Sequence, residues 1–271
     1  MLNNLKRCAV IARNYAVYRQ YDYLAATAKR DFPLDTDSEF VISVASYPKR
    51  IHLVPAVFES LARQEARARH AYLVLSEEDF PKRKLPSSIS QLQERGVVVI
   101  WTNNNPYAVK KLMPVWGRDP DCAVCTFDDD IIYEKTVTQR LAIGAHERPQ
   151  TIIGFWGKSL YRRGEQLSMW FREPANVNGT LIGNQVYLLG GGGVWYPPES
   201  LHPNVLNIDD VHEIVPGRGS DIWFWAAAHA AGAVHAWISP KGTQRLWTPI
   251  PQNQTTQPKE QPGRDILEDR F

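Results

Sequence analysis

Short apolar segments alternate with segments of helical periodicity from residue 40 onward, and this alternation constrains the fold more than any other feature of the chain. Residues 40–45 and 71–75 are short, apolar and rich in β-branched side chains, as buried strands are. Between them Val54, Val57 and Phe58 recur at helical spacing. A strand–helix–strand order of this kind predicts two parallel strands joined by a crossover helix.

The same alternation continues to residue 155. The remaining predicted elements here are helices at 87–95, 109–116 and 135–145, and strands at 97–101, 123–127 and 151–155. Ser87 is a suitable N-cap for the first of these helices, and Gly96 suits its C-terminal end. We therefore predict an α/β fold with a mostly parallel, twisted sheet flanked by helices.

Beyond residue 156 the periodicity weakens into a stretch rich in aromatics, Gly and Asn, with a strand at 186–189, a helix at 223–231 and a strand at 233–238. Four prolines after residue 248 argue against regular structure and favour a flexible tail or lid. We expect one domain in four parts: a helical extension at 1–39, halves at 40–155 and 156–248, and a tail at 249–271.

The charge balance limits the partners of the chain. Thirty-one Lys and Arg residues face 29 Asp and Glu residues, a formal net charge of +2. This surface is too balanced to coat a nucleic acid, so no nucleic-acid partner is expected. A hydrophobic content of 44% is enough for a substantial core.

Compartment and membrane contact follow from the cysteines and the apolar runs. No run reaches the roughly 18 residues of a membrane span, and the N-terminus lacks an uninterrupted signal-peptide core. Cys8, Cys122 and Cys125 suit a reducing compartment, so we expect a cytoplasmic protein and interpret the C-x-x-C pair as core. Residues 1–30 mix basic and apolar side chains, which favours a helix packed on the domain. A basic helix at the inner face of a membrane is the alternative.

An acidic triplet, Asp128-Asp129-Asp130, follows the strand at 123–127. Ligands of parallel α/β sheets bind beyond the carboxyl ends of the strands, which is where the triplet lies. In an extended segment Asp128 and Asp130 share one face and Asp129 points away, so the outer two can hold Mg²⁺ or Mn²⁺. A solvated acidic turn is the plain alternative.

Electrostatics requires compensation of these charges. Two carboxylates about 4 Å apart repel by about 1 kcal/mol in water and by about 4 kcal/mol at a partly buried site. A positive group should therefore lie near the triplet, either a metal ion or a side chain such as Lys135 or an arginine. Repulsion between the carboxylates thus predicts a cation beside the triplet but does not distinguish a metal ion from a basic side chain.

Polar residues also follow the first two strands. Ser46, Tyr47 and Arg50 come after the first strand, and Glu77 comes after the second. A nucleotide can be held there by stacking on Tyr47 and by hydrogen bonds to Ser46 and Glu77, while Arg50, Lys110 or Lys111 neutralises a phosphate. For each residue singly, an exposed loop position is an equally good interpretation.

Five motifs in order carry a family resemblance: SYPKRI, LSEEDFP, FDDDIIY, GGGGVWYPP and SDIWFW. Together they resemble bacterial glycosyltransferases of the GT-A (Rossmann-like) fold, similar to family 2 and related surface-polysaccharide enzymes. The resemblance covers about residues 40–240. The N-terminal extension and the C-terminal tail match nothing in it, and Ser220 stands where a second acid is expected.

The resemblance implies a hexosyltransferase-like enzyme that moves a sugar from a nucleotide-diphosphate donor to a hydroxyl of a glycan or lipid-linked acceptor. It implies Asp128 and Asp130 as the D-x-D metal pair for Mn²⁺ or Mg²⁺, with Asp129 beside them in the donor site. It also implies that residues 190–193 and Tyr196 lie near the transferred sugar or the acceptor.

By the same resemblance Asp221 is the general base of an inverting transfer. Such a transfer needs a carboxylate to accept the proton of the attacking hydroxyl, while the metal stabilises the departing diphosphate. Asp221 also opens a predicted helix, where an acid is favoured by the helix dipole alone. Asp209 and Asp210 are reserve candidates.

Glycines and tryptophans supply the remaining candidates. Gly191 and Gly192 follow a predicted strand and let the backbone approach a ligand, or they form a plain flexible turn. Most of the nine tryptophans should be core. Trp156, Trp170 and Trp195 are the better candidates for stacking on a sugar.

Two other functions stay open. A nucleotidyltransferase can use a similar sheet and metal-bound carboxylates, although SYPKR is not a glycine-rich phosphate loop. A non-catalytic carbohydrate-binding protein would use the aromatic half alone. The donor sugar, the nucleotide, the acceptor and the oligomeric state are not determined by these patterns.

Overall fold

An eight-stranded sheet forms the centre of the computed structural model, which describes residues 2–163, 166–170, 180–217, 219–238 and 246–252. In spatial order its strands are β3 (Val98–Thr102), β2 (Ala71–Ser76), β1 (Phe40–Ala45), β4 (Ala123–Phe127), β11 (Val194–Tyr196), β6 (Thr151–Gly154), β12 (Val234–Ile238) and β9 (Thr180–Gly183). The first four are mutually parallel. The predicted α/β class with a mostly parallel sheet is confirmed.

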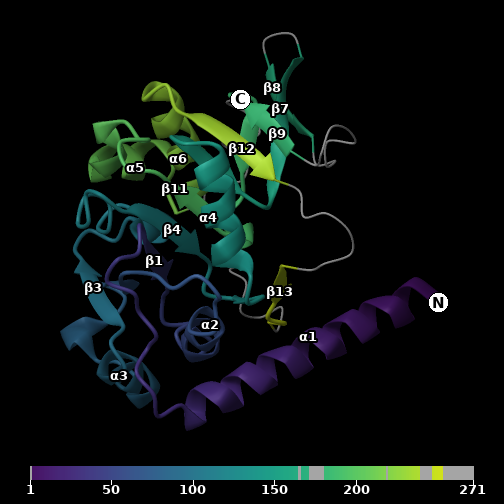
Figure 1. Ribbon diagram of the computed structural model, residues 1–271, viewed down its shortest axis with the longest axis vertical. Coiled ribbons are helices and arrows are strands. Elements are labelled where there is room, and N and C mark those ends of the chain that lie inside the picture. Colours follow the sequence, from purple (N-terminus) through teal and green to yellow (C-terminus); the bar gives the residue numbers. More distant parts are fainter. Residues whose placement is uncertain (1, 164–165, 171–179, 218, 239–245, 253–271) are drawn as a thin grey trace.

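The other side of the sheet has mixed strand directions. Strand β11 lies antiparallel between β4 and β6, β12 is parallel to β6, and β9 is antiparallel to β12. A second sheet has the order β10 (Val186–Leu188), β7 (Gly157–Arg163) and β8 (Gln166–Trp170), and Figure 1 shows β7 and β8 projecting from the body. A β-ladder also joins β5 (Ile131–Tyr133) and β13 (Trp247–Pro249).

The described residues contain six α-helices and four short 3₁₀ helices. They are α1 (Leu2–Thr27), α2 (Val54–Leu61), α3 (Ser87–Glu94), α4 (Val137–Glu147), α5 (Ile208–Ile214), α6 (Ser220–Ala230), η1 (Pro81–Arg83), η2 (Tyr107–Lys111), η3 (Gly190–Gly192) and η4 (Pro203–Leu206). Gly96 lies just past α3 with a φ of 104°, a conformation that favours glycine, so the predicted helix end is confirmed.

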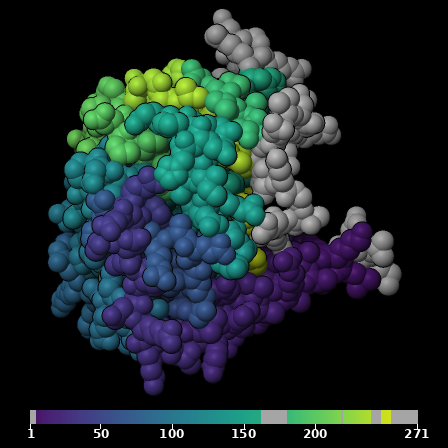
Figure 2. All heavy atoms as spheres, viewed as in Figure 1, coloured from purple at the N-terminus to yellow at the C-terminus, as the bar shows by residue number. Residues whose placement is uncertain are grey.

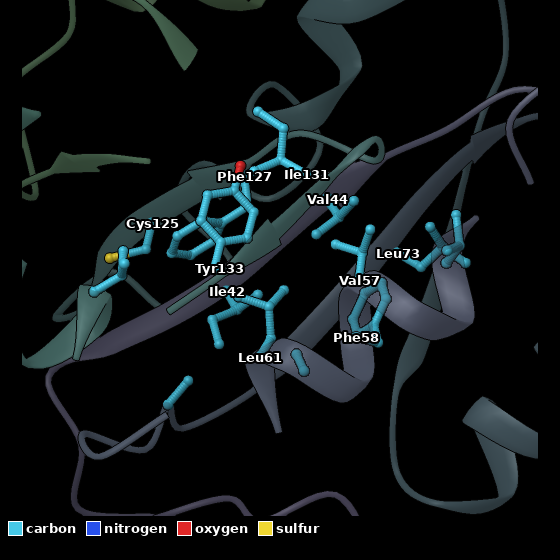
Figure 3. Packing of buried hydrophobic residues seen from close by; sticks show 14 of the residues in the cluster. Ile42, Val44, Val57, Phe58, Leu61, Leu73, Cys125, Phe127, Ile131 and Tyr133 are labelled. Carbon is cyan, nitrogen blue, oxygen red and sulfur yellow. The ribbon is translucent and has the colours of Figure 1, made fainter. Parts of the chain in front are cut away.

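The core explains why the parallel half was predictable. Strands β1, β2 and β4 are buried almost throughout, because helices cover a parallel sheet on its faces. Figure 3 shows Val57 and Phe58 of α2 packed beside Ile42 and Val44 of β1. Burying a side chain such as Phe58 stabilises the fold by about 1.5–3 kcal/mol. Apolar strands and an apolar helix face therefore suffice to define this half.

Two cysteines and one aromatic pair complete the core below the acidic triplet. Cys122 and Cys125 are buried, as the core interpretation required. The rings of Phe127 and Tyr133 meet edge to face, 4.7 Å apart between centroids. The last residue of β4 and the last residue of β5 thus fix both ends of the segment that carries Asp128–Asp130.

Three sequence-based predictions differ from the structure. Ser87 is the first helical residue of α3, and Pro86 occupies the N-cap position without a side-chain cap. The helix expected at 109–116 is the 3₁₀ helix η2 followed by turns. Pro249 lies within regular structure, as the last residue of β13. Proline's missing N–H is tolerated there because β13 is an edge strand.

Helix α1 packs on the domain through its C-terminal half only. Val17, Tyr18 and Tyr21 lie against the core, and Asn14 Nδ2 donates a hydrogen bond to the carbonyl oxygen of Pro249, at 3.1 Å. Residues 5–13 are all exposed, and Figures 1 and 2 show this end of the helix projecting from the body. Within the described part of the chain, no helix combines the length and the apolar character that crossing a membrane requires.

Candidate functional site

A cleft of about 720 Å³ opens beyond the carboxyl ends of β1, β2 and β4. Parallel sheets place their ligands at this edge, so the cleft is the strongest candidate for a binding site. It is lined by Ala45, Ser46, Tyr47, Arg50, Asp79, Asn105, Tyr107, Ala108, Lys110, Lys111, Asp128, Asp129, Gly217, Gly219, Ser220 and Asp221.

Eight of the residues selected from the sequence line this cleft. They are Ser46, Tyr47, Arg50, Lys110, Lys111, Asp128, Asp129 and Asp221. The first three follow β1, the acids follow β4, and Asp221 lies in the first turn of α6. Segments 175 residues apart in the chain, from Ser46 to Asp221, therefore meet in one depression.

The acidic triplet forms a turn, and this changes the expected orientation of Asp129. Strand β4 ends at Phe127 and β5 begins at Ile131, so the alternation of an extended segment does not apply between them. Asp129 does not point away from the site. It is only 5% exposed, and its Oδ2 atom accepts a hydrogen bond from Ser46 Oγ at 2.6 Å.

Arg50 is the principal cation of this turn. Its Nη1 atom lies 3.2 Å from Asp129 Oδ1 and its Nη2 atom lies 3.0 Å from Asp130 Oδ2. Burial raises the pKa of Asp129 to about 6, although Arg50 and Ser46 act in the opposite direction. Burial also raises the pKa of Asp130, again against Arg50. The predicted cation is thus an arginine, whereas Lys135 is exposed and pairs with Glu65 at 2.9 Å.

Asp130 lies behind the cleft. Besides Arg50, its Oδ2 atom accepts a hydrogen bond from Gln252 Nε2 at 2.7 Å, and its backbone carbonyl accepts one from the N–H of Ile250 at 2.8 Å. The segment that follows β13 therefore closes one side of the acidic turn. The tail predicted at 249–271 begins with this ordered contact, and residues 253–271 lie outside the described part of the chain.

Lys111 connects the acidic turn to α6. Its buried Nζ atom lies 2.7 Å from Asp128 Oδ1 and 4.0 Å from Asp221 Oδ1. Burial acts to lower the pKa of Lys111, but the two carboxylates together raise it, so the side chain is a cation. Burial raises the pKa of Asp221, and Lys111 opposes that shift. From the sequence, Lys111 was expected only as a phosphate partner, and its position between Asp128 and Asp221 was not predicted.

Gly190 explains how the three charged groups come so close. A Cβ atom at this position would lie 2.5 Å from Lys111 Nζ, 3.2 Å from Asp221 Oδ1 and 3.3 Å from Asp128 Oδ1. Only a residue without a side chain leaves room for that cluster. The glycine run therefore has a packing reason at the site, and it is not merely a flexible turn.

Lys110 forms a second polar group on the opposite wall. Its Nζ atom lies 3.1 Å from Asp79 Oδ2 and 3.2 Å from Asn105 Oδ1, and Asn105 Nδ2 donates to Asp79 Oδ2 at 3.0 Å. Burial lowers the pKa of Lys110 against the field of Asp79. Asp79 and Asn105 were not selected from the sequence. Asp79 belongs to the acidic LSEEDFP segment, which was noted in the sequence. The residue pattern of that segment does not indicate which of its three acids faces the cleft.

Glu77, like Glu78, does not line the cleft. It accepts a hydrogen bond from Arg83 Nε at 3.0 Å on the surface. A turn follows β2, so the side chain directed into the cleft is Asp79, two residues later. The expected hydrogen bond from Glu77 to a nucleotide therefore has no support in this arrangement.

Trp195 and Tyr196 are core residues. Trp195 is 4% exposed and its ring lies 5.3 Å from that of Phe40, whereas Tyr196 packs edge to face on Phe224. Both belong to β11, which lies between β4 and β6 with its side chains covered on both faces of the sheet. Both side chains therefore pack in the core.

Gly191, Gly192 and Trp156 lie together next to the cleft without lining it. A Cβ atom on Gly191 would lie 2.9 Å from Trp156 Cζ3, and one on Gly192 would lie 2.7 Å from Trp156 Cβ. Trp156 itself is 42% exposed. The side chain of Trp170 lies outside the described residues.

The acidic turn has the chemistry of a divalent-cation site. Its donors are carboxylate oxygens, the ligands that Mg²⁺ and Mn²⁺ prefer. Among the described residues no group of three or more His, Cys, Asp or Glu side chains is arranged to hold a metal. Mg²⁺ is typically held by one or two carboxylates, with phosphate oxygens of the substrate completing its shell. The residues therefore fit a metal that binds together with a phosphate ligand.

Comparison with known proteins gives two distant structural similarities. No protein-family model and no curated protein matches the chain. Two solved structures similar to it are CMP:2-keto-3-deoxy-manno-octonic acid synthetase complexed with CTP and S. aureus TarS 1-349 in complex with UDP. The first is 12% identical over 75% of this chain and 90% of its own, with a TM-score of 0.47. The second is 14% identical over 76% of this chain and 59% of its own, also with a TM-score of 0.47. At these values neither similarity carries a functional argument.

Proposed function

We propose that the protein is a metal-dependent glycosyltransferase that uses a nucleotide-diphosphate sugar as donor and a hydroxyl of a glycan or lipid-linked saccharide as acceptor. The observation that carries the proposal is the cluster of Asp128, Lys111 and Asp221 at the carboxyl edge of the sheet. One acid belongs to a turn rich in carboxylates and the other stands alone on α6. Transfer to a hydroxyl needs two such acidic centres with different tasks.

The donor side of the cleft supplies the groups that a nucleoside diphosphate requires. Arg50, Lys110 and Lys111 line it, and all three lie beside carboxylates that would share them with a phosphate. Tyr47 offers an aromatic face next to Arg50, whose guanidinium carbon lies 5.7 Å from the ring centroid. We assign this face to the base of the nucleotide.

A divalent cation would be held by Asp128, which lines the cleft, and by Asp130 once Arg50 has moved from it toward the diphosphate, together with oxygens of the diphosphate. When bound, it would supply Lewis-acid stabilisation of the charge on the departing phosphate. Arg50 and Lys111 offset part of the negative charge of the turn in its absence, because several carboxylates packed at one buried turn repel one another. Both cations would then shift from the carboxylates toward the diphosphate.

Asp221 is the proposed general base. It would accept the proton of the acceptor hydroxyl while that oxygen forms a bond to the anomeric carbon and the bond to the phosphate oxygen breaks. The electron pair of the broken bond leaves with the nucleoside diphosphate, and the sugar carbon inverts. Burial raises the pKa of Asp221, which makes its carboxylate a better proton acceptor than an exposed one.

Helix α1 supports an acceptor at a lipid surface. Its exposed first turns carry Lys6, Arg7 and Arg13 beside the exposed apolar side chains of Leu5 and Ile11. No acidic residue occurs before position 22. Basic side chains without acidic neighbours favour contact with anionic lipid. Co-sedimentation with phosphatidylglycerol vesicles that is lost on substituting the three cations by glutamate would support this location.

A thermal-shift panel tests the proposed activity. The panel contains UDP-, GDP-, dTDP- and CMP-sugars, each with and without Mn²⁺, and nucleoside triphosphates as the arm for a nucleotidyltransferase. A donor at about 100 times its Kd stabilises the fold by about 2.7 kcal/mol. We expect a shift with one nucleotide sugar that depends on Mn²⁺. A shift with a triphosphate alone would favour the nucleotidyltransferase, and no metal-dependent shift with any nucleotide sugar would contradict the proposal.

A further inference from the structure

Two tryptophans from distant parts of the chain form a stacked pair next to the cleft. Trp156 follows β6 and Trp247 opens β13, and their rings lie 6.0 Å apart between centroids with a 20° angle between planes. Trp156 is 42% exposed, the largest exposure of any tryptophan whose side chain the structure describes. Large exposed aromatic surface is unfavourable in water, and it marks a contact site when it lies beside a cleft.

The backbone holds both rings in place. Trp247 pairs with Tyr133 in the β13–β5 ladder, and the N–H of Glu134 donates to the carbonyl of Leu246 at 2.8 Å. The carbonyl of Trp156 accepts a hydrogen bond from the N–H of Leu189, also at 2.8 Å. The pair is therefore anchored to the strand that leaves the acidic turn and to the strand end that enters the glycine run. A pre-organised platform of this kind loses little conformational entropy when a ligand binds.

The platform lies one residue away from the charged cluster. The Cβ position of Gly190 lies against Lys111 Nζ, Asp221 and Asp128, and the Cβ position of Gly191 lies against the ring of Trp156. Consecutive Cα atoms are about 3.8 Å apart. The tryptophan pair and the charged cluster therefore pack against neighbouring glycines of one 3₁₀ helix, so a saccharide bound to the pair would have Asp221 close by.

The chemistry of the platform selects the ligand. An indole ring covers the apolar C–H face of a pyranose, whereas phosphates are drawn to the cations on the other side of the cleft. None of the cleft cations Arg50, Lys110 and Lys111 pairs with either tryptophan among the described contacts.

We propose that Trp156 and Trp247 form the subsite for a pyranose ring of the saccharide acceptor, which they orient toward Asp221. This proposal rests on the proposed glycosyltransferase function. It assigns to the C-terminal strand β13 a direct part in acceptor binding, because Trp247 reaches the platform only through the pairing of β13 with β5.

Titration with simple sugars tests the platform directly. The probes are methyl glycopyranosides of glucose, galactose, mannose and N-acetylglucosamine, followed by saturation-transfer NMR on the full chain. We expect at least one probe to bind wild type, with affinity reduced roughly tenfold, about 1.4 kcal/mol, in Trp156→Ala. Trp247→Ala should weaken binding as well, and Trp156→Phe should restore part of it.

Trp225→Ala is the matched control. Trp225 also lies in an aromatic stack, with His229 at 5.6 Å, but on α6 and outside the cleft lining. Its loss should leave sugar binding unchanged. Binding that is equal in wild type and Trp156→Ala, or no binding of any probe, would overturn the proposal.

The donor panel measured on the same variants separates this proposal from the proposed function. Sugar binding that depends on Trp156 without any nucleotide-sugar binding would leave the platform standing and would remove the glycosyltransferase assignment. Metal-dependent donor binding that Trp156→Ala retains, without a sugar effect of that variant, would remove the platform alone.

Discussion

The parallel and the mixed halves of the central sheet contribute to one cleft in different ways. The half built from β3, β2, β1 and β4 contributes a charged network in which every acid of the triplet has a basic partner. The half built from β11, β6, β12 and β9 lies next to a solitary acid on α6, a glycine run and a stacked tryptophan pair of which Trp156 is exposed. In the proposed function, the first half serves the anionic phosphates and the second the neutral sugar hydroxyls.

This difference has a physical basis in the connections between strands. Parallel strands joined by helices end at the same edge of the sheet. The loops that follow them therefore meet there without specific contacts between distant residues. Outside the parallel half, pairings such as Trp247 with Tyr133 join residues 114 apart in the chain. Substitutions in the parallel half should therefore impair donor binding, whereas those in the mixed half should impair sugar transfer.

The largest expected effect is that of Asp221→Asn in the mixed half. Loss of a general base typically lowers the rate of the chemical step by about 10²–10⁴-fold. We expect transfer to fall by this factor while metal-dependent donor binding is retained, as measured by release of nucleoside diphosphate and by thermal shift. Asp209→Asn is the control, since this acid is exposed in the first turn of α5. Equal loss in the control would contradict the assignment of Asp221.

Arg50→Ala should give the next largest effect, on the stability of the parallel half. It removes the partner of Asp129 and Asp130, and leaving buried carboxylates unpaired costs about 3–5 kcal/mol. Urea unfolding at pH 7 measures this loss. Arg83→Ala, which removes the exposed pair with Glu77, should cost less than about 1 kcal/mol. If both variants lose the same small amount, the acidic turn does not depend on Arg50.

His235 in β12 gives the mixed half its own pH dependence. Burial, with a smaller contribution from His229, lowers its pKa from 6.5 to about 4. The unfolded chain then binds more protons than the folded one between these values, so stability is complete above pH 6.5 and is lost as the pH falls toward 4. The loss is at most about 3 kcal/mol.

Unfolding free energies at pH 7 and pH 5 measure that contribution. His235→Phe should show a smaller decrease between the two pH values than wild type does. His52→Gln, at an exposed position, should retain the wild-type decrease. An unchanged decrease in His235→Phe would show that other groups dominate this pH range.

The smallest expected effect tests the contact between the C-terminal segment and the acidic turn. Gln252→Ala removes the hydrogen bond to Asp130 and the one from Arg50, at a cost of about 1 kcal/mol. The melting temperature should fall slightly, and the donor affinity should fall with it because Asp130 loses a fixed partner. Gln93→Ala on the exposed face of α3 should change neither. Unchanged donor affinity in Gln252→Ala would show that the segment after β13 does not contribute to donor binding. Its part in the site would then be confined to the Trp156–Trp247 pair.

The parallel half was largely predictable from local patterns. The strand at 40–45, the glycine after α3 and the position of Asp128 beyond β4 follow from periodicity and turn chemistry, which depend on neighbouring residues only. The same patterns failed where a turn replaced an extended segment. Asp129 and Glu77 were oriented wrongly for that reason, and Asp79 was missed.

Other contacts were less predictable because they join residues that are distant in the chain. Nothing near Pro249 indicates that β13 will pair with β5, and nothing near Lys111 indicates that it will bridge Asp128 and Asp221. Trp195 was taken for a binding residue because its segment is irregular, yet the strand that contains it lies in the centre of the sheet. Local sequence identified the acidic, basic and aromatic side chains that could serve a site. Pairing between distant segments decided which of them are accessible.

The central claim is that the acidic turn binds the donor with its metal and that Asp221 acts only in transfer. Calorimetric titration of the donor found by the thermal-shift panel, in the presence of Mn²⁺, tests it on wild type, Asp128→Asn, Asp130→Asn and Asp221→Asn. We predict that the two substitutions in the turn abolish Mn²⁺-dependent binding, whereas Asp221→Asn binds like wild type. Equal loss of binding in all three variants would contradict the division of roles.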